Sequence, residues 1–298
     1  MTVSPGTELP PGTELPPGIE LSPGTELPWA VQPVRVSGDW LALREPADAA
    51  ARAADLAEEV GRLLPTAGRA VICDLGCGSG SMSRWLAPLL PGEQHWILYD
   101  RDPDLLALAA AGMPDAGRVT VETRRRDITR LGPDELVGAG LITASALLDM
   151  MTGDELDRFV ATCAAAGCPV LVTISVIGRV EFTPADPLDE LIAEAFNAHQ
   201  RRVTDGRRLL GPDAAGAARD AFTRLGADVQ VRPSPWRLGA DRAALAAEWF
   251  SGWVAAACQQ RPDLVPRAVP YARRRMAEAS AGRLRVTVHH TDLLAVRR

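Results

Sequence analysis

Residues 70–86, A-V-I-C-D-L-G-C-G-S-G-S-M-S-R-W-L, decide the fold. Residues 70–75 form an apolar run of strand length, and three glycines at alternate positions follow it. A strand, a glycine turn and a helix in this order open the ligand site of a doubly wound sheet, because glycines let a ligand approach the backbone. The apolar residues after the turn recur at the spacing of one buried helix face: Met82, Trp85, Leu86 and Leu89.

The spacing of the glycines indicates which cofactor the turn holds. The dinucleotide fingerprint G-x-G-x-x-G needs its third glycine three residues after the second, and that position is Ser81. The segment D-L-G-C-G-S-G instead resembles motif I, E/D-x-G-x-G-x-G, of the class I S-adenosylmethionine (SAM) methyltransferases. The resemblance implies that a loop lies under the methionine part of SAM, with these residues in contact: Asp74, Gly76, Cys77, Gly78 and Gly80.

Two later acidic residues support the same resemblance. Residues 95–99 predict a second strand that ends at Asp100, where a carboxylate can accept hydrogen bonds from both ribose hydroxyls. Residues 119–125 predict a third strand, and Asp127 follows it. In the family, this acidic residue takes the adenine amino group and its apolar neighbour, here Ile128, lies on the ring. The alternative is that both carboxylates only solvate loops. Two more residues complete the expected cofactor site: Arg101 and Ser145.

Composition excludes several other classes of protein. The chain has 298 residues, 47% of them hydrophobic and 23% charged, which is typical of a globular protein. It contains no lysine, which excludes a Walker A loop, a Schiff-base lysine and the Tyr-x-x-x-Lys pair of short-chain dehydrogenases. The formal net charge of −6 argues against a nucleic-acid partner.

The cysteines and the apolar segments favour a cytoplasmic enzyme. The five cysteines lack paired C-x-x-C spacing, which favours reduced thiols over a disulfide or a metal site. We find neither a run of eighteen uncharged apolar residues nor a secretory signal, so we expect no membrane association. We also expect no bound metal.

We expect three parts along the chain. Residues 1–33 form a disordered tail, because a repeat of P-G-T-E-L-P type carries proline and glycine in every unit. Residues 34–68 form a helical lead-in over the cofactor site, with an irregular start and one helix from Pro46 to about residue 64. Either Arg44 or Arg52 could meet the SAM carboxylate or an acidic substrate, and the alternative is an exposed helix charge. The third part, residues 69–298, is the methyltransferase domain.

The fold class that we predict is α/β: a doubly wound, seven-stranded, mostly parallel sheet of the Rossmann-like methyltransferase type. The remaining strands are expected at 140–146, 169–176, 229–231 and 283–290. The resemblance implies that the last of these is antiparallel. Helical insertions at 181–210 and 241–282 are expected to cap the substrate.

Asp149 is the candidate catalytic residue, because it follows the fourth strand by three residues at the edge where ligands of open α/β sheets bind. A carboxylate there can orient an acceptor or take its proton. The alternative is a polar entry to the next helix, which a T-x-x-E capping box opens at Thr152. Candidate substrate contacts are His199, Trp236 and Trp249; the alternative for the aromatic ones is a place in the core.

These observations predict an enzyme that transfers a methyl group from SAM to a small-molecule acceptor by in-line displacement. The strand-four segment S-A-L-L-D lacks the N/D-P-P-aromatic motif of enzymes that methylate amino groups of DNA, RNA or protein glutamine. Two alternatives stay open: a methyltransferase that acts on a macromolecule, and a non-catalytic SAM-binding protein. The sequence leaves the acceptor, the methylated atom and the oligomeric state open.

Overall fold

The computed structural model describes residues 36–65, 68–113 and 117–297, so the predicted tail lies outside the described residues. Within these residues the chain divides into two compact units. The sheet unit comprises Val36–Val180, Gln200–Arg237 and the last strand from Thr287. The helical unit comprises Glu181–His199 and Leu238–Val286.

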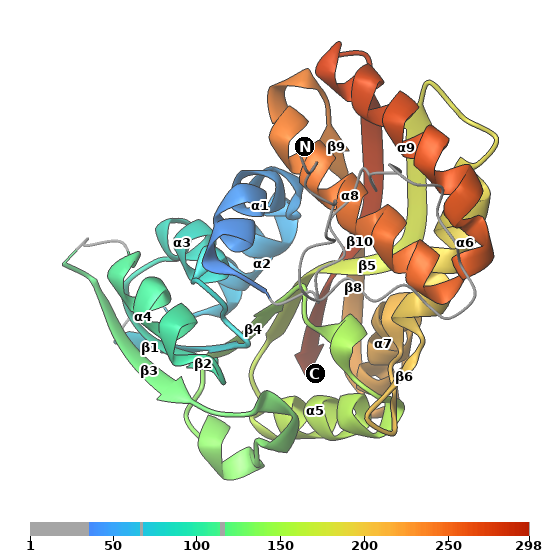
Figure 1. The fold of residues 1–298 in the computed structure, drawn as a ribbon. Coiled ribbons are helices and arrows are strands. Elements are labelled where there is room, and N and C mark those ends of the chain that lie inside the picture. Colours follow the sequence, from blue (N-terminus) through green and yellow to red (C-terminus); the bar gives the residue numbers. More distant parts are fainter. Residues whose placement is uncertain (1–35, 66–67, 114–116, 298) are drawn as a thin grey trace, which may run out of the picture. The chain divides into compact units, whose positions relative to one another are not determined.

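The sheet unit is built on one mixed sheet (Figure 1), with strand order β3-β2-β1-β4-β5-β10-β8 and the short β9 paired to β10. Neighbours from β3 to β5 pair in parallel, whereas β10 is antiparallel to β8. The predicted α/β fold, mostly parallel with a late antiparallel strand, is therefore confirmed. The sheet has eight strands in the described residues rather than the predicted seven, because the short β9 pairs with β10. The strands are β1 Arg69–Leu75, β2 Glu93–Asp100, β3 Val119–Arg125, β4 Leu141–Ser145, β5 Val170–Thr183, β8 Ala227–Pro233, β9 Trp236–Leu238 and β10 Arg285–Arg297.

Helices cover both faces of this sheet. The side chains on the two faces of β1 belong to two different core clusters. Cys73 and Leu75 pack in the cluster that includes residues of α5 and α7. Ala70 and Ile72 pack in the cluster that includes residues of α2, α3 and α4. The helices of the sheet unit are α1 Gly38–Ala51, α2 Ala54–Leu63, α3 Ser81–Leu86, α4 Pro103–Ala111, α5 Gly153–Ala165 and α7 Ala214–Arg224. A short hairpin joins β6 Val203–Thr204 to β7 Arg207–Arg208.

The prediction of one helix from Pro46 is wrong, because two helices occupy the lead-in. The first, α1, already begins at Gly38, where the Ser37 hydroxyl accepts a hydrogen bond from the Trp40 N–H at 3.1 Å. The chain then leaves the helical conformation at Arg52 (ψ 139°). The N–H of Ala53 donates to a buried carboxylate of β10 at 2.8 Å, and this bond fixes the break before α2.

The helix that we predicted after the glycine turn is also longer than the one in the structure. The helix α3 ends at Leu86, and a 3-10 turn over Ala87–Leu89 follows it. Leu89, which we expected to be buried, is 53% exposed. Pro88 lacks the N–H that a continuing α-helix would need, which accounts for the change.

The helical unit contains α6 Asp189–Gln200, α8 Ala243–Gln260 and α9 Val265–Ser280. An aromatic cluster holds it together, with the Phe182 and Trp253 rings 5.2 Å apart. Arg275 is buried and donates to the carboxylate of Asp189, which also accepts a 2.7 Å bond from the Tyr271 hydroxyl. No helix in the described part of the chain has the length and apolar character needed to cross a bilayer.

Candidate active site

The glycine turn is held against the end of β2 by backbone hydrogen bonds. The N–H groups of Gly76 and Cys77 both donate to the carbonyl oxygen of Tyr99, at 2.8 and 2.9 Å. Gly76, Gly78 and Gly80 have φ values of 69°, 54° and 88°, a region that favours glycine. The sequence therefore needs glycine at these positions for the turn itself, before any ligand is considered.

The surroundings of the turn add a steric reason for all three glycines. A Cβ atom on Gly76 would lie 2.8 Å from the Leu147 side chain. A Cβ atom on Gly80 would lie 3.0 Å from the Cα atom of Ala109 in α4. A Cβ atom on Gly78 would lie 3.1 Å from the Leu41 side chain of α1. The turn is thus closely packed between α1 and α4.

Asp100 fixes the turn from the end of β2. Its Oδ2 atom accepts a hydrogen bond from the Gly78 N–H at 2.9 Å, and its Oδ1 atom accepts one from the Asp102 N–H at 3.0 Å. Each carboxylate oxygen has two lone pairs, so each can still accept a bond from a ligand hydroxyl. Asp100 is half-buried, which suits a residue that both supports the turn and meets a ligand.

Asp74 lies at the base of the turn and is only 1% exposed. The hydroxyl of Thr143 in β4 donates to its Oδ1 atom at 2.8 Å. Its Oδ2 atom is buried and has no hydrogen-bond partner among the described residues. Burial raises the pKa of this carboxyl group from its usual 3.8 to about 7, against the opposing effects of the Thr143 bond and of nearby Arg52.

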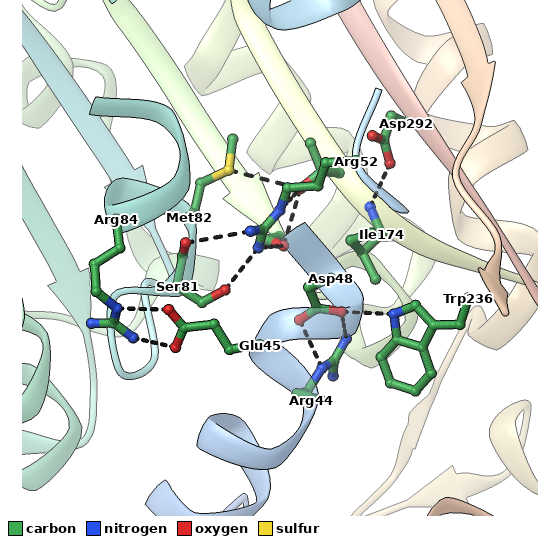
Figure 2. Close-up of polar contacts among 12 residues, drawn as sticks. Arg44, Glu45, Asp48, Arg52, Ser81, Met82, Arg84, Ile174, Trp236 and Asp292 are labelled. Carbon is green, nitrogen blue, oxygen red and sulfur yellow. Dashed lines mark hydrogen bonds and ion pairs between the residues drawn. The ribbon is translucent and has the colours of Figure 1, made fainter. Parts of the chain in front are cut away.

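Arg52, at the break between α1 and α2, points toward the start of α3 (Figure 2). Its guanidinium donates to Ser81 at both the carbonyl oxygen (3.3 Å) and Oγ (3.0 Å). It also donates to Ser145 Oγ at 3.1 Å and to Thr173 Oγ1 at 3.4 Å. Arg52 is 5% exposed, and its burial lowers the pKa of the guanidinium. Ser145, a predicted cofactor contact, is therefore part of this group.

Two further contacts of α1 are visible in Figure 2. The Glu45 carboxylate accepts a hydrogen bond from Arg84 Nε of α3 at 2.7 Å. Arg84 also donates to the Ser79 carbonyl oxygen at 2.6 Å. One turn later, Asp48 accepts bonds from Arg44 Nε and from Trp236 Nε1, both at 2.9 Å. Through these contacts α1 packs against the glycine turn and β9.

Asp149 lies in a 3-10 turn, Leu148–Met150, directly after β4. It is half-buried, and desolvation raises the pKa of its carboxyl group to about 6, while the charge of Arg44 acts in the opposite direction. A carboxylate with this pKa is ionised at pH 7 and can still accept a proton. The role remains a prediction.

The other predicted cofactor contacts are more exposed. Asp127 is exposed and caps the following turn, accepting bonds from the Thr129 N–H (3.1 Å) and hydroxyl (2.8 Å). Ile128 is half-buried beside it. Arg101 is exposed, whereas Cys77 is buried in the turn and its burial raises the pKa of the thiol well above the usual range.

The three predicted substrate contacts belong to different units. Trp236, in the sheet unit, is 2% exposed and its N–H is satisfied by Asp48, which is the behaviour of a core side chain. His199 lies in the helical unit with its Nε2 atom 3.2 Å from Gln259 Oε1. Trp249 is half-buried there and stacks on Trp253 at 5.5 Å. These assignments stay predictions.

Sequence reasoning missed Asp292 in β10, which is fully buried. Its Oδ1 atom accepts bonds from the Ile174 N–H (2.7 Å) and from Ser234 Oγ (2.5 Å), and its Oδ2 atom accepts the Ala53 N–H (2.8 Å). Ile174 has a φ of 55°, which is strained for a β-branched residue. The available signal was a single acidic residue inside an apolar strand, in T-D-L-L-A-V.

Comparison with known proteins finds a match to the part of the chain that contains the glycine turn. Residues 72–169 match a family model described as a methyltransferase domain. They run from β1 to the end of the segment before β5, and so include the glycine turn, Asp74, Asp100 and Asp149. This part of the chain, about a third of its length, is therefore similar to a methyltransferase domain. The mostly parallel sheet with a late antiparallel strand is the one that the resemblance seen in the sequence implies.

Several solved structures are similar to this chain. A putative type II methyltransferase from Anaeromyxobacter dehalogenans is 20% identical, with 82% of this chain and 95% of that chain covered and a TM-score of 0.49. A cyclopropane synthase from Mycobacterium tuberculosis is 14% identical (87% and 94% covered, TM-score 0.48). A geranyl diphosphate C-methyltransferase from Streptomyces coelicolor is 10% identical (82% and 77% covered, TM-score 0.43). No curated protein matches the chain at a significant level.

Proposed function

We propose that this methyltransferase transfers the methyl group of SAM to a small-molecule acceptor. The observation that carries the proposal is the glycine turn at the carboxyl edge of the sheet. Asp100 accepts a hydrogen bond from the Gly78 N–H of this turn. Asp74, at its base, has one buried oxygen without a hydrogen-bond partner among the described residues. Ligands of open α/β sheets bind at this edge. The net charge of −6 and the lack of an N/D-P-P-aromatic motif after β4 favour a small acceptor over a nucleic acid or protein.

The residues of the site have separable tasks. SAM supplies a methyl group that is already activated on a sulfonium. The glycine turn binds the cofactor, Asp100 accepts hydrogen bonds from the ribose hydroxyls, and Asp127 with Ile128 receives the adenine. Holding two reactants in line and away from water can lower a barrier by about 7–11 kcal/mol. Alignment is therefore the main contribution that this chain has to make.

A proton must also leave when the acceptor is a hydroxyl or an ammonium group. We assign its removal to Asp149, which lies at the carboxyl end of β4. With a pKa of about 6 the carboxylate is mostly ionised at pH 7, yet basic enough to take a proton during transfer.

The proposal is tested by incubating the full chain with methyl-labelled SAM and three acceptor pools: small metabolites, protein and nucleic acid. We expect label in the small-metabolite pool only. Label in protein or nucleic acid would overturn the acceptor class. Binding of SAM without transfer to any pool would indicate a non-catalytic SAM-binding protein. The Gly78→Val variant is the control, because it removes the turn's fit while leaving the rest of the chain unchanged.

A further inference from the structure

Arg44 of α1 uses two of its three guanidinium nitrogens within the protein. Its Nε and Nη2 atoms donate to the two oxygens of Asp48, at 2.9 and 3.2 Å. The third nitrogen, Nη1, has no hydrogen-bond partner in the described part of the chain, and the side chain is 15% exposed. Arginine has five N–H donors, and the two on Nη1 therefore stay available to a ligand.

The orientation of this guanidinium is fixed from a second side. It lies over the ring of Trp236, 4.9 Å from the ring centroid, and Figure 2 shows the three side chains together. The N–H of the same ring donates to Asp48 at 2.9 Å, so the carboxylate and the ring support each other. A donor that is already held in place loses little freedom when it binds a ligand.

His290 of β10 is a second polar group beside Trp236. The two rings have centroids 5.1 Å apart, and His290 is 3% exposed. Its Nδ1 atom is buried and has no hydrogen-bond partner among the described residues. Burial lowers the pKa of the imidazole to about 3, so the ring is neutral at pH 7. A buried polar atom without a partner is unfavourable, and a ligand can supply the missing bond.

Arg44 also connects this group to Asp149, the candidate base at the end of β4. Burial shifts the pKa of Asp149 and of His290 toward the neutral form, and the positive charge of Arg44 opposes protonation of both. Asp149 is half-buried in the turn after β4. Arg44, Asp149 and His290 thus come from three separate elements of the sheet unit, and none of them belongs to the glycine turn.

A cationic donor next to a base favours an oxygen nucleophile over an amine. A hydroxyl or carboxylate oxygen has more than one lone pair, so it can accept a hydrogen bond from Arg44 and still attack a methyl group. A neutral amine has one lone pair, and a bond from Arg44 would occupy it. The guanidinium also stabilises negative charge on an oxygen that loses its proton.

We propose that Arg44 donates a hydrogen bond through Nη1 to the acceptor oxygen that receives the methyl group, beside Asp149 and His290. This inference rests on the proposed function and narrows its acceptor to a hydroxyl or a carboxylate. The oxygen forms the new bond to carbon, and the S–CH₃ bond breaks with its electron pair staying on sulfur. The proton of a hydroxyl passes to Asp149, whereas a carboxylate has none to lose.

The first experiment uses the wild-type chain. A small-metabolite pool is divided on a cation exchanger at pH 7, which retains amines, and each fraction is incubated with methyl-labelled SAM. We expect transfer to the unretained fraction, and hot hydriodic acid should release the label as methyl iodide, as it does from O-methyl groups. Mild alkali separates the two sources, because it cleaves a methyl ester and leaves a methyl ether intact.

The second experiment removes the donor. With a limiting amount of the unretained fraction, Arg44→Gln should transfer label about 10- to 100-fold more slowly than wild type, as expected for a lost bond from a charged donor. Its SAM affinity in calorimetry should stay within threefold. Arg62→Gln is the matched control, because it removes the same charge from an exposed position on α2 and should leave the rate unchanged.

Four outcomes would overturn the inference. Two come from the wild type alone, so they remain decisive when a variant fails to fold: transfer to the retained amines only, and label that resists hydriodic acid. A rate within threefold of wild type in Arg44→Gln would show that the acceptor does not need this donor. A parallel loss of SAM affinity and rate in that variant would make Arg44 structural. SAM binding without transfer to any fraction would instead refute the proposed function.

Discussion

Replacing Asp74 by asparagine should stabilise the ligand-free protein at pH 8 and weaken SAM binding at the same time. Burial raises the pKa of Asp74 to about 7, whereas the unfolded chain keeps the usual 3.8. Below pH 4 the carboxyl group is protonated in both states and has no effect on stability. As the pH rises from 4 to 7 the unfolded state loses its proton first, so folding becomes progressively less favourable.

The structure sets the size of this effect. One pKa unit corresponds to about 1.4 kcal/mol, so ionisation of Asp74 opposes folding by about 4 kcal/mol above pH 7. Asparagine carries no charge and can keep the bond from Thr143, but its amide N–H₂ takes the unpartnered Oδ2 position. An unsatisfied buried donor costs about 1–3 kcal/mol. The net expectation at pH 8 is a gain of about 1–3 kcal/mol.

The pH dependence separates this reasoning from a general packing effect. Between pH 5 and pH 8 the stability of Asp74→Asn relative to wild type should rise by about 3 kcal/mol, which is roughly 6–12 °C in Tm for a chain of this size. Thermal unfolding without SAM, at both pH values, measures it. Calorimetry at pH 8 should show SAM affinity reduced tenfold or more. The same Tm difference at pH 5 and pH 8 would refute the raised pKa of Asp74.

The remaining predictions concern the turn, the edge of β4 and the tail. Gly78→Val should abolish SAM binding in calorimetry with a near wild-type circular dichroism spectrum, because the residue has a φ of 54° and faces Leu41; unchanged affinity would contradict the site. Asp149→Asn should lower turnover about a hundredfold with SAM affinity unchanged, and turnover within a few-fold of wild type would make the residue structural. Deleting residues 1–28 should leave Tm and SAM affinity unchanged, and a Tm lowered by several degrees would show that the repeat packs on the domain.

Local patterns in the sequence predicted the elements that local interactions determine. The strand before the turn and the capping box at Thr152 appear as expected, because each depends on residues within one or two turns of chain. The acidic residue at the end of β2 was also predictable, since its position at the carboxyl edge follows from the strand alone. Its bond to the Gly78 N–H was not, because that contact joins the end of β2 to the glycine turn, 22 residues away.

Two departures from the predicted elements have a common cause, which is a contact distant in sequence. Helical spacing predicted one continuous helix from Pro46, and a carboxylate 239 residues away breaks it at Ala53. The same carboxylate imposes a positive φ on Ile174, a residue whose type predicts extended strand. Neither event leaves a pattern in the neighbouring residues, so periodicity could not detect it.

The distinction between satisfied and unsatisfied buried polar groups supports the proposed site independently of the motif. Asp48 and Asp292 are as buried as Arg52 and Asp74, yet the first two use both carboxylate oxygens within the protein. A buried group that the fold satisfies contributes to the fold. A buried group that the fold leaves unsatisfied opposes folding, so a bound proton or a bound ligand stabilises it. Asp74, whose Oδ2 atom has no partner among the described residues, lies at the base of the glycine turn, which is where we propose that the ligand binds.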